Sequence, residues 1–447
     1  MSVPSRNLTI LRVSVLWDGY GLEVHFHDNK YAFHSQWLYD ARGDRSTSRS
    51  VDQAFSIDET DARIRKATLG KTIITTLHVE WEDRSATDFP AAWVRVFAPL
   101  VARPLEKSKG QYQTKKIGWT TDTIKIQELD WNIIFPPQDP TCGLEDDVRI
   151  KIAELLLYSS SESIIKVTNS PEPDITCEKA GKDNFVTQVL KQIFDHVFTR
   201  PKPALDSSLK LRDNCGEDRM QEASIPPGYR ADHVILPRVD QAQYESFIKQ
   251  PAQIMGLYCL EGESLITFVS GIAAWDTLNY EDPEDAHFLT DIPAVIGHVV
   301  ETPSSSMYQA ASEPAVVLDY NEHVKHIRWN CHRAGFLTAP FEKFSRARKT
   351  YQKYQEIMQR PSHQLKIKFK PGDMYIWNNH VTLNGRESVL TAPHMSIGDI
   401  VPMHVVSEKY RSMQIKRLEK LVPASWLAHV PSPQLRDMAK LLGMGES

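Results

Sequence analysis

The 447-residue sequence lacks the features that mark several large protein classes. Its five cysteines lie far apart and no two have CxxC spacing, which argues against a disulfide framework and against a cysteine-based zinc or redox motif. No apolar run approaches the roughly 18 residues of a membrane-spanning helix, and the first residues lack the apolar core of a secretory signal. We therefore expect a cytoplasmic protein without a membrane partner.

The charge balance and the absence of two loop motifs argue against further classes of function. Lys and Arg number 52 against 57 Asp and Glu, so the net charge of -5 gives no reason to expect a nucleic-acid partner. The chain has no glycine-rich phosphate loop and no GxSxG nucleophile elbow. Hydrophobic residues make up 41%, which is ordinary for a globular protein of two or three domains.

The first 103 residues have the pattern of a small β-rich domain. Short alternating or β-branched runs alternate with turn signals such as Asp18-Gly19, and one segment reads as a short helix or an extended arm. These runs are residues 11–17, 21–27, 73–81 and, for the helix or arm, 91–101. Residues 104–128 are rich in Lys, Thr and Gln and are predicted to form a linker.

Residues 129–447 are predicted to form a second, larger domain, so that the chain as a whole is mostly β with helices. Two amphipathic helices come first, at 144–159 and 184–199, and a charged helix at 341–360 interrupts the later strands. Many short strands with one inserted helix indicate a barrel-like β-sandwich. The expected strands are 163–168, 233–236, 254–260, 265–269, 294–300, 315–319, 325–330, 364–369, 374–378 and 380–383, followed by a helical tail at 408–442.

Several motifs, in their order along the chain, resemble gamma-butyrobetaine dioxygenase and trimethyllysine dioxygenase, within the taurine dioxygenase superfamily. They are Trp37-Leu38-Tyr39-Asp40, Val79-Glu80-Trp81-Glu82-Asp83, Gly256-Leu257-Tyr258-Cys259-Leu260, Phe369-Lys370-Pro371-Gly372-Asp373 and Asn384-Gly385-Arg386. Together they extend over nearly the whole chain. The resemblance implies a double-stranded β-helix (jelly-roll) catalytic domain preceded by the small β-rich N-terminal domain. It also implies iron(II), 2-oxoglutarate and hydroxylation of small amino acids or betaines.

The ligands that the resemblance implies are mostly absent. The iron-binding His-x-Asp and the distal histidine map to Arg230, Asp232 and Asn384. A guanidinium cannot ligate a metal, and an amide oxygen is a poor substitute for imidazole. The arginine that binds 2-oxoglutarate falls near Ile397, and no cysteine follows Asp40 where the N-terminal zinc ligands belong. We therefore predict no metal and no cofactor, with iron(II) and 2-oxoglutarate as the alternative.

Strand parity suggests what the replaced site does. Arg230 and Asp232 share parity and should point into the barrel mouth, where an Arg–Asp pair could hold a substrate carboxylate or form a structural ion pair. His380 shares parity with Asn384, so it could face the same cavity as a general acid or base. The predicted catalytic residues are thus Arg230, Asp232, His380 and Asn384. His380 could equally be an ordinary strand residue.

Four further residues are predicted to bind the substrate. Arg386 follows the distal position, and Asn330 ends a strand that resembles the family's substrate pocket. Tyr258 and Trp329 could line that pocket, although aromatic residues on strands more often belong to the core.

Three functions remain open from the sequence. The first is a metal-independent enzyme that performs a cyclisation, isomerisation, elimination or hydrolysis on a small metabolite. The second is a catalytically silent homologue that binds a ligand or supports a partner subunit, for which the helical tail offers a homodimer or heterodimer interface. The third is an unusual iron(II)/2-oxoglutarate oxygenase with displaced ligands.

Overall fold

The computed structural model divides the chain into two units, which are described separately. Unit 1 comprises residues 1–114 and 407–447, and unit 2 comprises residues 115–406. The residues that the structure describes are 9–42, 62–70, 76–105, 118–137, 144–158, 164–172, 185–194, 209–212, 235–238, 254–302, 305–319, 322–329, 334–401 and 403–444. None of the helices in these ranges is long and apolar enough to cross a bilayer.

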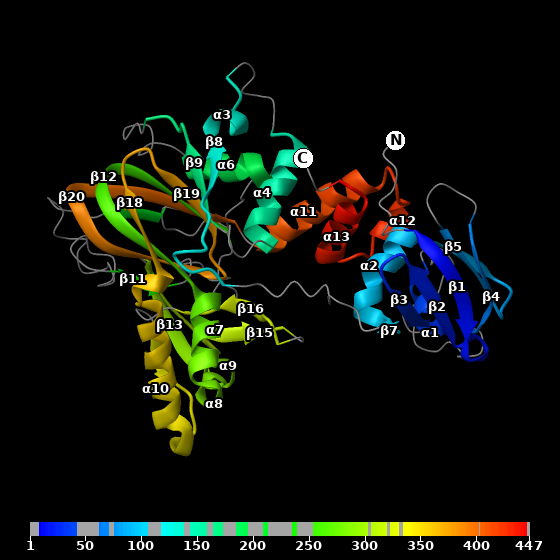
Figure 1. Ribbon diagram of the computed structural model, residues 1–447. Helices are drawn as coiled ribbons and strands as arrows, with labels where there is room; N and C mark the ends of the chain where they lie inside the picture. The colour runs from blue at the N-terminus through cyan, green and yellow to red at the C-terminus, as the bar shows by residue number, and fades with distance from the viewer. Residues whose placement is uncertain are drawn as a thin grey trace. The chain divides into compact units, whose positions relative to one another are not determined.

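Unit 1 contains two small antiparallel sheets and helices from both ends of the chain (Figure 1). One sheet has the order β1-β2-β3-β7 and the other the order β4-β5-β6. Their strands are β1 (Ile10–Leu16), β2 (Gly21–Phe26), β3 (Lys30–His34), β7 (Arg103–Pro104), β4 (Ile64–Leu69), β5 (Thr76–Trp81) and β6 (Ala86–Pro90). The helices are α1 (Ser35–Asp40), α2 (Ala91–Val101), α12 (Ala424–Leu427), α13 (Ser432–Leu441) and, from residue 407 on, α11 (Met403–Leu418). The segment predicted as helix or arm is therefore the helix α2.

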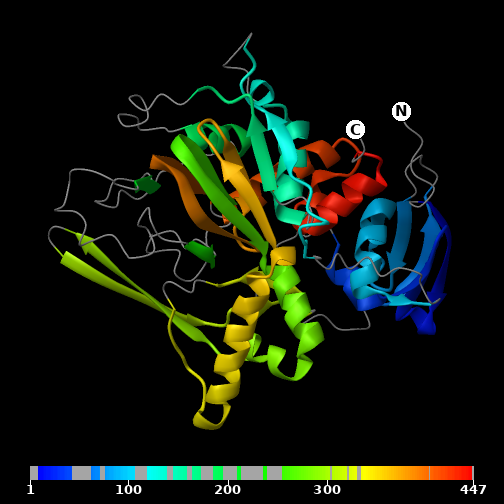
Figure 2. The same ribbon diagram turned by 60° about the vertical axis from the view of Figure 1, so that its left-hand side comes forward.

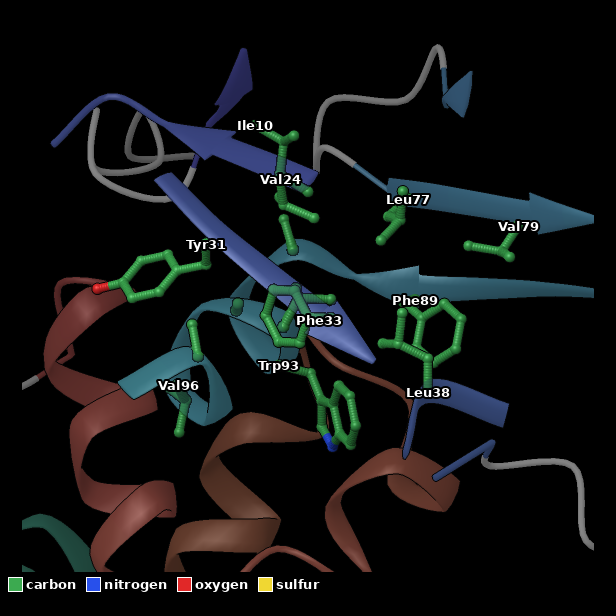
Figure 3. Packing of buried hydrophobic residues seen from close by; sticks show 14 of the residues in the cluster. Ile10, Val24, Tyr31, Phe33, Leu38, Leu77, Val79, Phe89, Trp93 and Val96 are labelled. Carbon is green, nitrogen blue, oxygen red and sulfur yellow. The ribbon is translucent and has the colours of Figure 1, made fainter. Parts of the chain in front are cut away.

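The core of unit 1 is aromatic and joins distant parts of the sequence (Figure 3). Trp93 of α2 packs against Phe89 at a ring-centroid distance of 5.9 Å and stacks on Trp37 at 5.4 Å. Trp426 of α12 closes the cluster, 5.1 Å from the Trp93 ring and 5.2 Å from the Phe89 ring. The sequence suggested that the tail belongs to the second domain, but the structure groups it with unit 1, because its apolar residues complete this core.

Unit 2 is built on an eight-stranded sheet in which β12 (Ile254–Ser270) pairs with β20 (Thr382–Val401) along most of its length (Figures 1 and 2). The order is β10-β20-β12-β19-β9-β8, with β11 also on β20 and β18 also on β12. The other strands are β8 (Gln127–Asp130), β9 (Ile164–Thr168), β10 (Leu209–Arg212), β11 (Ile235–Arg238), β18 (Gln364–Phe369) and β19 (Met374–Asn378). Irregular register between Cys259 and Ile266 marks several β-bulges, which bend strands.

The bend folds the two halves of β12 toward one another, so that the sheet curls as in a jelly roll. Phe268 in the second half packs edge-on against Trp377, at 5.1 Å, and Trp377 is paired with Met255 in the first half. Residues of both halves and of β18 and β19 share one buried apolar cluster. We call the side of the sheet that faces this cluster the interior face. The two strands predicted at 254–260 and 265–269 are thus a single bent strand.

Helices and short strands pack around the curled sheet. On the side of β12 away from the interior cluster, Gly256 leaves room for Val186 of α6, because an added Cβ would lie 2.4 Å from the Val186 side chain. The further elements of unit 2 are α3 (Trp131–Ile134), α4 (Asp146–Tyr158), α6 (Phe185–Phe194), α7 (Gly271–Glu281), α8 (Pro283–Ala286), α9 (Phe288–Asp291), β13 (Ala294–Thr302), β14 (Ser305–Glu313), β15 (Val316–Leu318), β16 (Val324–Ile327), β17 (Ala334–Leu337), α10 (Phe341–Met358) and η6 (Pro361–His363).

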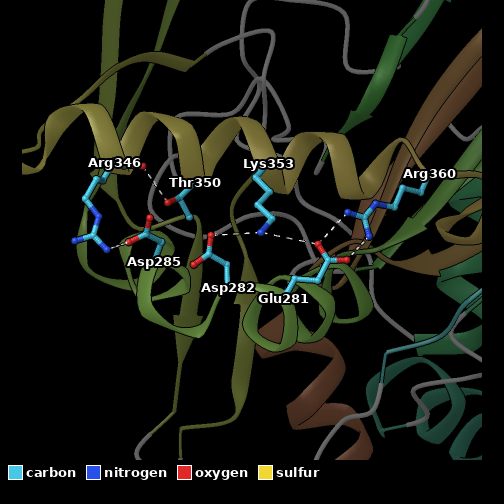
Figure 4. A network of polar contacts seen from close by, with 7 residues as sticks. All are labelled: Glu281, Asp282, Asp285, Arg346, Thr350, Lys353 and Arg360. Atoms are coloured by element: carbon cyan, nitrogen blue, oxygen red, sulfur yellow. Dashed lines mark hydrogen bonds and ion pairs between the residues drawn. The ribbon is translucent and has the colours of Figure 1, made fainter.

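Ion pairs join α10 and the residues that follow it to α7 and α8 (Figure 4). Arg360 donates to both carboxylate oxygens of Glu281, and Lys353 lies 3.3 Å from a carboxylate oxygen of Asp282. Arg346 pairs with Asp285 at the other end of the row. Such exposed pairs each contribute roughly 0 to 1 kcal/mol. The row therefore contributes little to stability, and α10 is packed through buried residues that include Tyr354 and Ile357.

His363, beside this row, gives unit 2 a predicted acid sensitivity. Its side chain is buried, its Nδ1 has no hydrogen-bond partner among the described residues, and burial together with the nearby Arg360 lowers its pKa. The folded form then resists protonation that the unfolded chain accepts below a pH of about 6.5. Stability is complete above that pH and falls below it, by at most about 1.4 kcal/mol per pH unit.

Urea unfolding at pH 7.5 and pH 5.5 measures this effect. The native protein should lose stability at the lower pH, and His363→Gln should lose less, because the variant has no group that titrates there. An equal loss in both proteins would show that His363 does not cause the sensitivity.

Candidate functional site

Asn384 and Arg386 lie on the interior face of the curled sheet. Both belong to β20, where Asn384 is the cross-strand partner of Phe268 and Arg386 that of Ile266. Directly paired residues of antiparallel strands project from the same face. Since Phe268 and Ile266 belong to the interior cluster, the side chains of Asn384 and Arg386 project to the same side.

Aromatic rings cover much of this face. Phe268 lies between Trp377, at a centroid distance of 5.1 Å, and Tyr375, at 6.2 Å. Tyr375 also contacts Phe369 at 6.0 Å. Burial raises the pKa of the Tyr375 hydroxyl above its ordinary value.

Three buried polar atoms on this face have no hydrogen-bond partner within the described part of the chain. They are Asn384 Oδ1, Trp377 Nε1 and Ser264 Oγ. Ser264 shares the face because it pairs with Phe369 of the interior cluster. Leaving a buried polar group unsatisfied costs about 1–3 kcal/mol, so such groups are uncommon in native proteins. One acceptor, one donor and one hydroxyl are therefore disposed to engage a polar molecule.

Arg386 adds a buried positive charge to the interior face. Only 6% of the residue is exposed. A guanidinium stays charged in proteins and binds carboxylates through two parallel hydrogen bonds. The interior face thus combines aromatic surface, neutral hydrogen-bonding groups and one cation, a combination suited to a small organic anion.

Three of the predicted site residues, Arg230, Asp232 and Asn330, lie outside the described residues. The strand that begins three residues after Asp232 is β11, and it pairs with β20. Its residues Ile235 and Arg238 are the cross-strand partners of Arg386 and Asn384. The backbone that follows the predicted Arg–Asp pair therefore runs directly beside the two described residues of the site.

The parity argument for His380 was wrong, because His380 lies in a turn and not in a strand. β20 begins at Thr382, two residues later. The turn is fixed by the His380 backbone, which donates to Asn378 Oδ1 and accepts from the Ile327 backbone N–H. The imidazole is buried against that of His326 on β16, with ring centroids 5.2 Å apart. His380 is thus in ring contact with His326.

Tyr258 and Trp329, predicted to line a pocket, both pack within the protein. Tyr258 donates its hydroxyl to the Pro171 carbonyl oxygen and meets Phe185 of α6 edge-on. Trp329 stacks on Tyr351 of α10, at 5.8 Å, in a core separate from the interior cluster. Their packing explains their burial without a ligand, and a pocket role for them stays a prediction.

The described residues of this site do not match the donors that iron(II) requires. At the position where the resemblance implies an imidazole, β20 carries the amide of Asn384, and a guanidinium follows two residues later. Oxygenases of this type hold iron with two histidines and one carboxylate. Within the described ranges no three His, Cys, Asp or Glu side chains gather into a metal-binding group. An amide beside a cation is a poor iron site on chemical grounds.

The sequence did not predict that Trp377 and Ser264 lie on the interior face, or that His326 contacts His380. Trp377 lies in β19, whose five residues are all buried, a pattern that predicts a core strand but not an unpaired indole N–H. Ser264 precedes the strand predicted at 265–269. Both residues share one face because β12 bends. The bend depends on tertiary contacts, so a local pattern in the sequence does not reveal it.

Comparison with known proteins gives one family match. Residues 234–395 match the family described as taurine catabolism dioxygenase TauD, TfdA family. Among curated proteins, the mitochondrial trimethyllysine dioxygenase of Gallus gallus is 20% identical over 386 residues, which cover 84% of this chain and 82% of the relative. The mitochondrial trimethyllysine dioxygenase of Mus musculus is 23% identical over 380 residues, covering 82% and 79%.

Solved structures give weaker likenesses. A putative alpha-ketoglutarate-dependent taurine dioxygenase from Burkholderia xenovorans has a TM-score of 0.39 and 12% identity, covering 62% of this chain and 90% of that one. An asparagine oxygenase in complex with Fe(II), 3-hydroxyasparagine and succinate has a TM-score of 0.38 and 14% identity, covering 63% and 84%.

Proposed function

Because this chain is a divergent member of the taurine dioxygenase superfamily, we propose that it retains a small-molecule site within its curled sheet and uses it without the iron triad. The proposed ligand is a small organic anion, and the proposed reaction is a non-redox step: cyclisation, isomerisation, elimination or hydrolysis. The observation that carries the proposal is the buried guanidinium of Arg386 on the same face as the unpartnered Asn384 amide oxygen.

Each described residue has a specific proposed task. Arg386 holds a carboxylate of the ligand through two charge-assisted hydrogen bonds, which also fix its orientation. Asn384 Oδ1 accepts a hydrogen bond from the ligand, and the indole N–H of Trp377 donates one. In a low-dielectric interior such fixed dipoles stabilise charge that develops during reaction. Proton transfer is assigned to Asp232, as predicted from the sequence. The same role for His380 stays a prediction without the support of strand parity, since His380 lies in a turn beside His326.

An iron(II)/2-oxoglutarate oxygenase is the second candidate. It is favoured by the family match and by curated relatives whose names are those of dioxygenases. This candidate is better served by ligands other than Asn384 and Arg230, since a guanidinium cannot ligate iron and an amide oxygen is a poor substitute for imidazole. A catalytically silent homologue, acting as a ligand-binding protein or as a subunit of a homodimer or heterodimer, and a cytoplasmic location stay predictions.

Two measurements on the purified full chain separate these functions. The first incubates the protein anaerobically with iron(II), determines bound iron, and then follows conversion of 2-oxoglutarate to succinate in air with and without candidate amino acids and betaines. The second measures thermal stabilisation by a panel of mono- and dicarboxylic acids in the presence of a chelator, with uncharged amides of the same acids as controls.

We expect substoichiometric iron, no succinate, and stabilisation by at least one carboxylate but not by its amide. Stoichiometric iron with succinate formation would establish the oxygenase instead. If no carboxylate raised the melting temperature, the proposed anion site would be wrong. Stabilisation without conversion of the ligand, followed by mass spectrometry over hours, would identify the silent homologue.

A further inference from the structure

A polar cluster ties α1 to the turn between β5 and β6 in unit 1. Tyr39 donates its hydroxyl to Asp83 Oδ2, at 2.7 Å, and Arg42 donates from Nη1 to Ser85 Oγ, at 3.1 Å. The partners are more than 40 residues apart in sequence. We call Tyr39, Arg42, Asp83 and Ser85 the α1–turn cluster. It connects two segments that have no cysteine to crosslink them.

The members of the α1–turn cluster contact one another, and the charges of Arg42 and Asp83 cancel. The guanidinium carbon of Arg42 lies 3.5 Å from the centre of the Tyr39 ring, and Arg42 Nη1 lies 4.0 Å from Asp83 Oδ2. Ser85 donates to Asp83 Oδ1 from its hydroxyl, at 2.5 Å, and from its backbone N–H, at 2.8 Å. Both carboxylate oxygens are therefore engaged, and the single positive charge is stacked on an aromatic ring, which is a favourable cation–π arrangement.

The α1–turn cluster is also connected to the core of unit 1. Tyr39 is buried, and its ring meets that of Trp81 edge-on at 5.1 Å. Trp81 in turn donates its indole N–H to Thr87 of β6, at 3.0 Å. The crosslink thus acts on the β5–β6 hairpin and not only on an exposed turn.

The chemistry of these residues does not fit a structural zinc site. The resemblance implied zinc-binding cysteines directly after Asp40, which is where Arg42 stands. Structural zinc is bound tetrahedrally by cysteine, histidine or carboxylate side chains. Of the α1–turn cluster only Asp83 is such a ligand, and a guanidinium lies within 4.0 Å of its carboxylate. The one potential metal ligand of the α1–turn cluster thus already lies beside a cation.

We propose that the α1–turn cluster replaces zinc as the crosslink between α1 and the β5–β6 hairpin, so that unit 1 reaches its native stability without a metal. The two segments are joined by one cation–π stack and hydrogen bonds where a metal would use coordinate bonds. Unit 1 is then insensitive to chelators and to oxidation of zinc-bound thiols.

The first test measures metal dependence. The full chain, expressed in zinc-supplemented medium and purified without chelator, is analysed for metals by mass spectrometry, and its melting temperature is recorded with and without excess EDTA. We expect substoichiometric zinc and no shift with EDTA or with added zinc. One zinc per chain, or a melting temperature lowered by EDTA, would overturn the proposal.

The second test breaks the α1–turn cluster. Arg42→Ala removes the stacked cation, and the nearly isosteric Asp83→Asn removes the anion with little risk to folding. Each should lower the first melting transition by about 3 °C or more, as expected for a domain of this size that loses roughly 1 kcal/mol. The matched control is Arg65→Ala, which breaks an exposed ion pair with Glu80 in the same unit and should leave the transition nearly unchanged.

Acid titration gives an independent measure of the same contacts. Burial alone would raise the pKa of Asp83, but hydrogen bonds from Ser85 and Tyr39, with the charge of Arg42, outweigh it and hold the pKa below its usual value. The stabilisation is then complete above about pH 3.9 and is lost as the pH falls through the folded pKa. Asp83→Asn should remove this part of the acid response. Variants no more destabilising than Arg65→Ala, with an unchanged acid response, would refute the crosslink.

Discussion

Replacing Arg386 by alanine is expected to lower the affinity for the carboxylate that stabilises the native chain by roughly 100-fold. A buried charge-assisted pair with a ligand contributes about 2–5 kcal/mol when one partner is removed, and a 100-fold loss corresponds to about 2.7 kcal/mol. Arg386→Lys should recover only part of the affinity, because an ammonium keeps the charge but lacks the planar two-point geometry of guanidinium. Isothermal titration calorimetry with that carboxylate measures both variants.

Lys368→Ala provides the matched control for Arg386. Lys368 lies on β18 of the same sheet, but its side chain is exposed and paired with Glu263, 2.9 Å away. Its removal takes away one positive charge without touching the interior face. Ligand affinity that fell equally in Lys368→Ala and Arg386→Ala would point to a general electrostatic effect and against the interior site.

The second large effect is expected at Asp28, in unit 1. The guanidinium of Arg95 on α2 is 2% exposed and lies 2.6 Å from an Asp28 carboxylate oxygen. The rings of Phe26 and Tyr31 flank the same guanidinium, 5.4 Å and 5.5 Å from its central carbon. Asp28→Ala leaves this buried cation without its carboxylate, which costs about 3–5 kcal/mol. We expect unit 1 to unfold well before unit 2 in thermal or urea denaturation.

Two variants test the origin of that effect. Asp28→Asn keeps a hydrogen-bond acceptor and should restore a part of the stability. Asp88→Ala breaks a pair with His78 in which the Asp88 side chain is 68% exposed, and it should change the stability little. Equal destabilisation by Asp28→Ala and Asp88→Ala would contradict the importance of the buried charge.

The sequence predicted correctly the bounds of those elements that are marked by turn residues or by an alternating run. The strands β18 and β19 and the helix α2 begin and end where the sequence suggested, because turn residues or an alternating run mark their ends. The sequence predicted a break at residues 261–264, between two strands, and Gly262 in this segment has a φ of +72°. In the structure these residues are bulges within β12, a choice made by pairing with β20 and not by the residues themselves.

The helix α7 and the turn at His380 were likewise not predictable, because tertiary contacts determine them. α7 begins with a run of small and apolar residues, Gly271-Ile272-Ala273-Ala274, and its start is marked by the Ser270 cap, which accepts from the Ala273 N–H. His380 was assigned to a strand from its neighbours, whereas Asn378 Oδ1 and Ile327 hold it in a turn. Asn384 and Arg386 could be proposed as site residues because motif resemblance, unlike periodicity, points to individual positions.

The aromatic core of unit 1 can be completed only after most of the chain has been synthesised. Trp426 packs on Phe89 and Trp93, so the core that begins to form near residue 90 is completed by residues more than 300 positions later. A chain emerging from the ribosome therefore has all of unit 2 available to fold before unit 1 is complete. Until then Phe89 and Trp93 have their N-terminal partners, such as Trp37, but lack Trp426, and apolar surface left uncovered in this way promotes aggregation of partly folded chains.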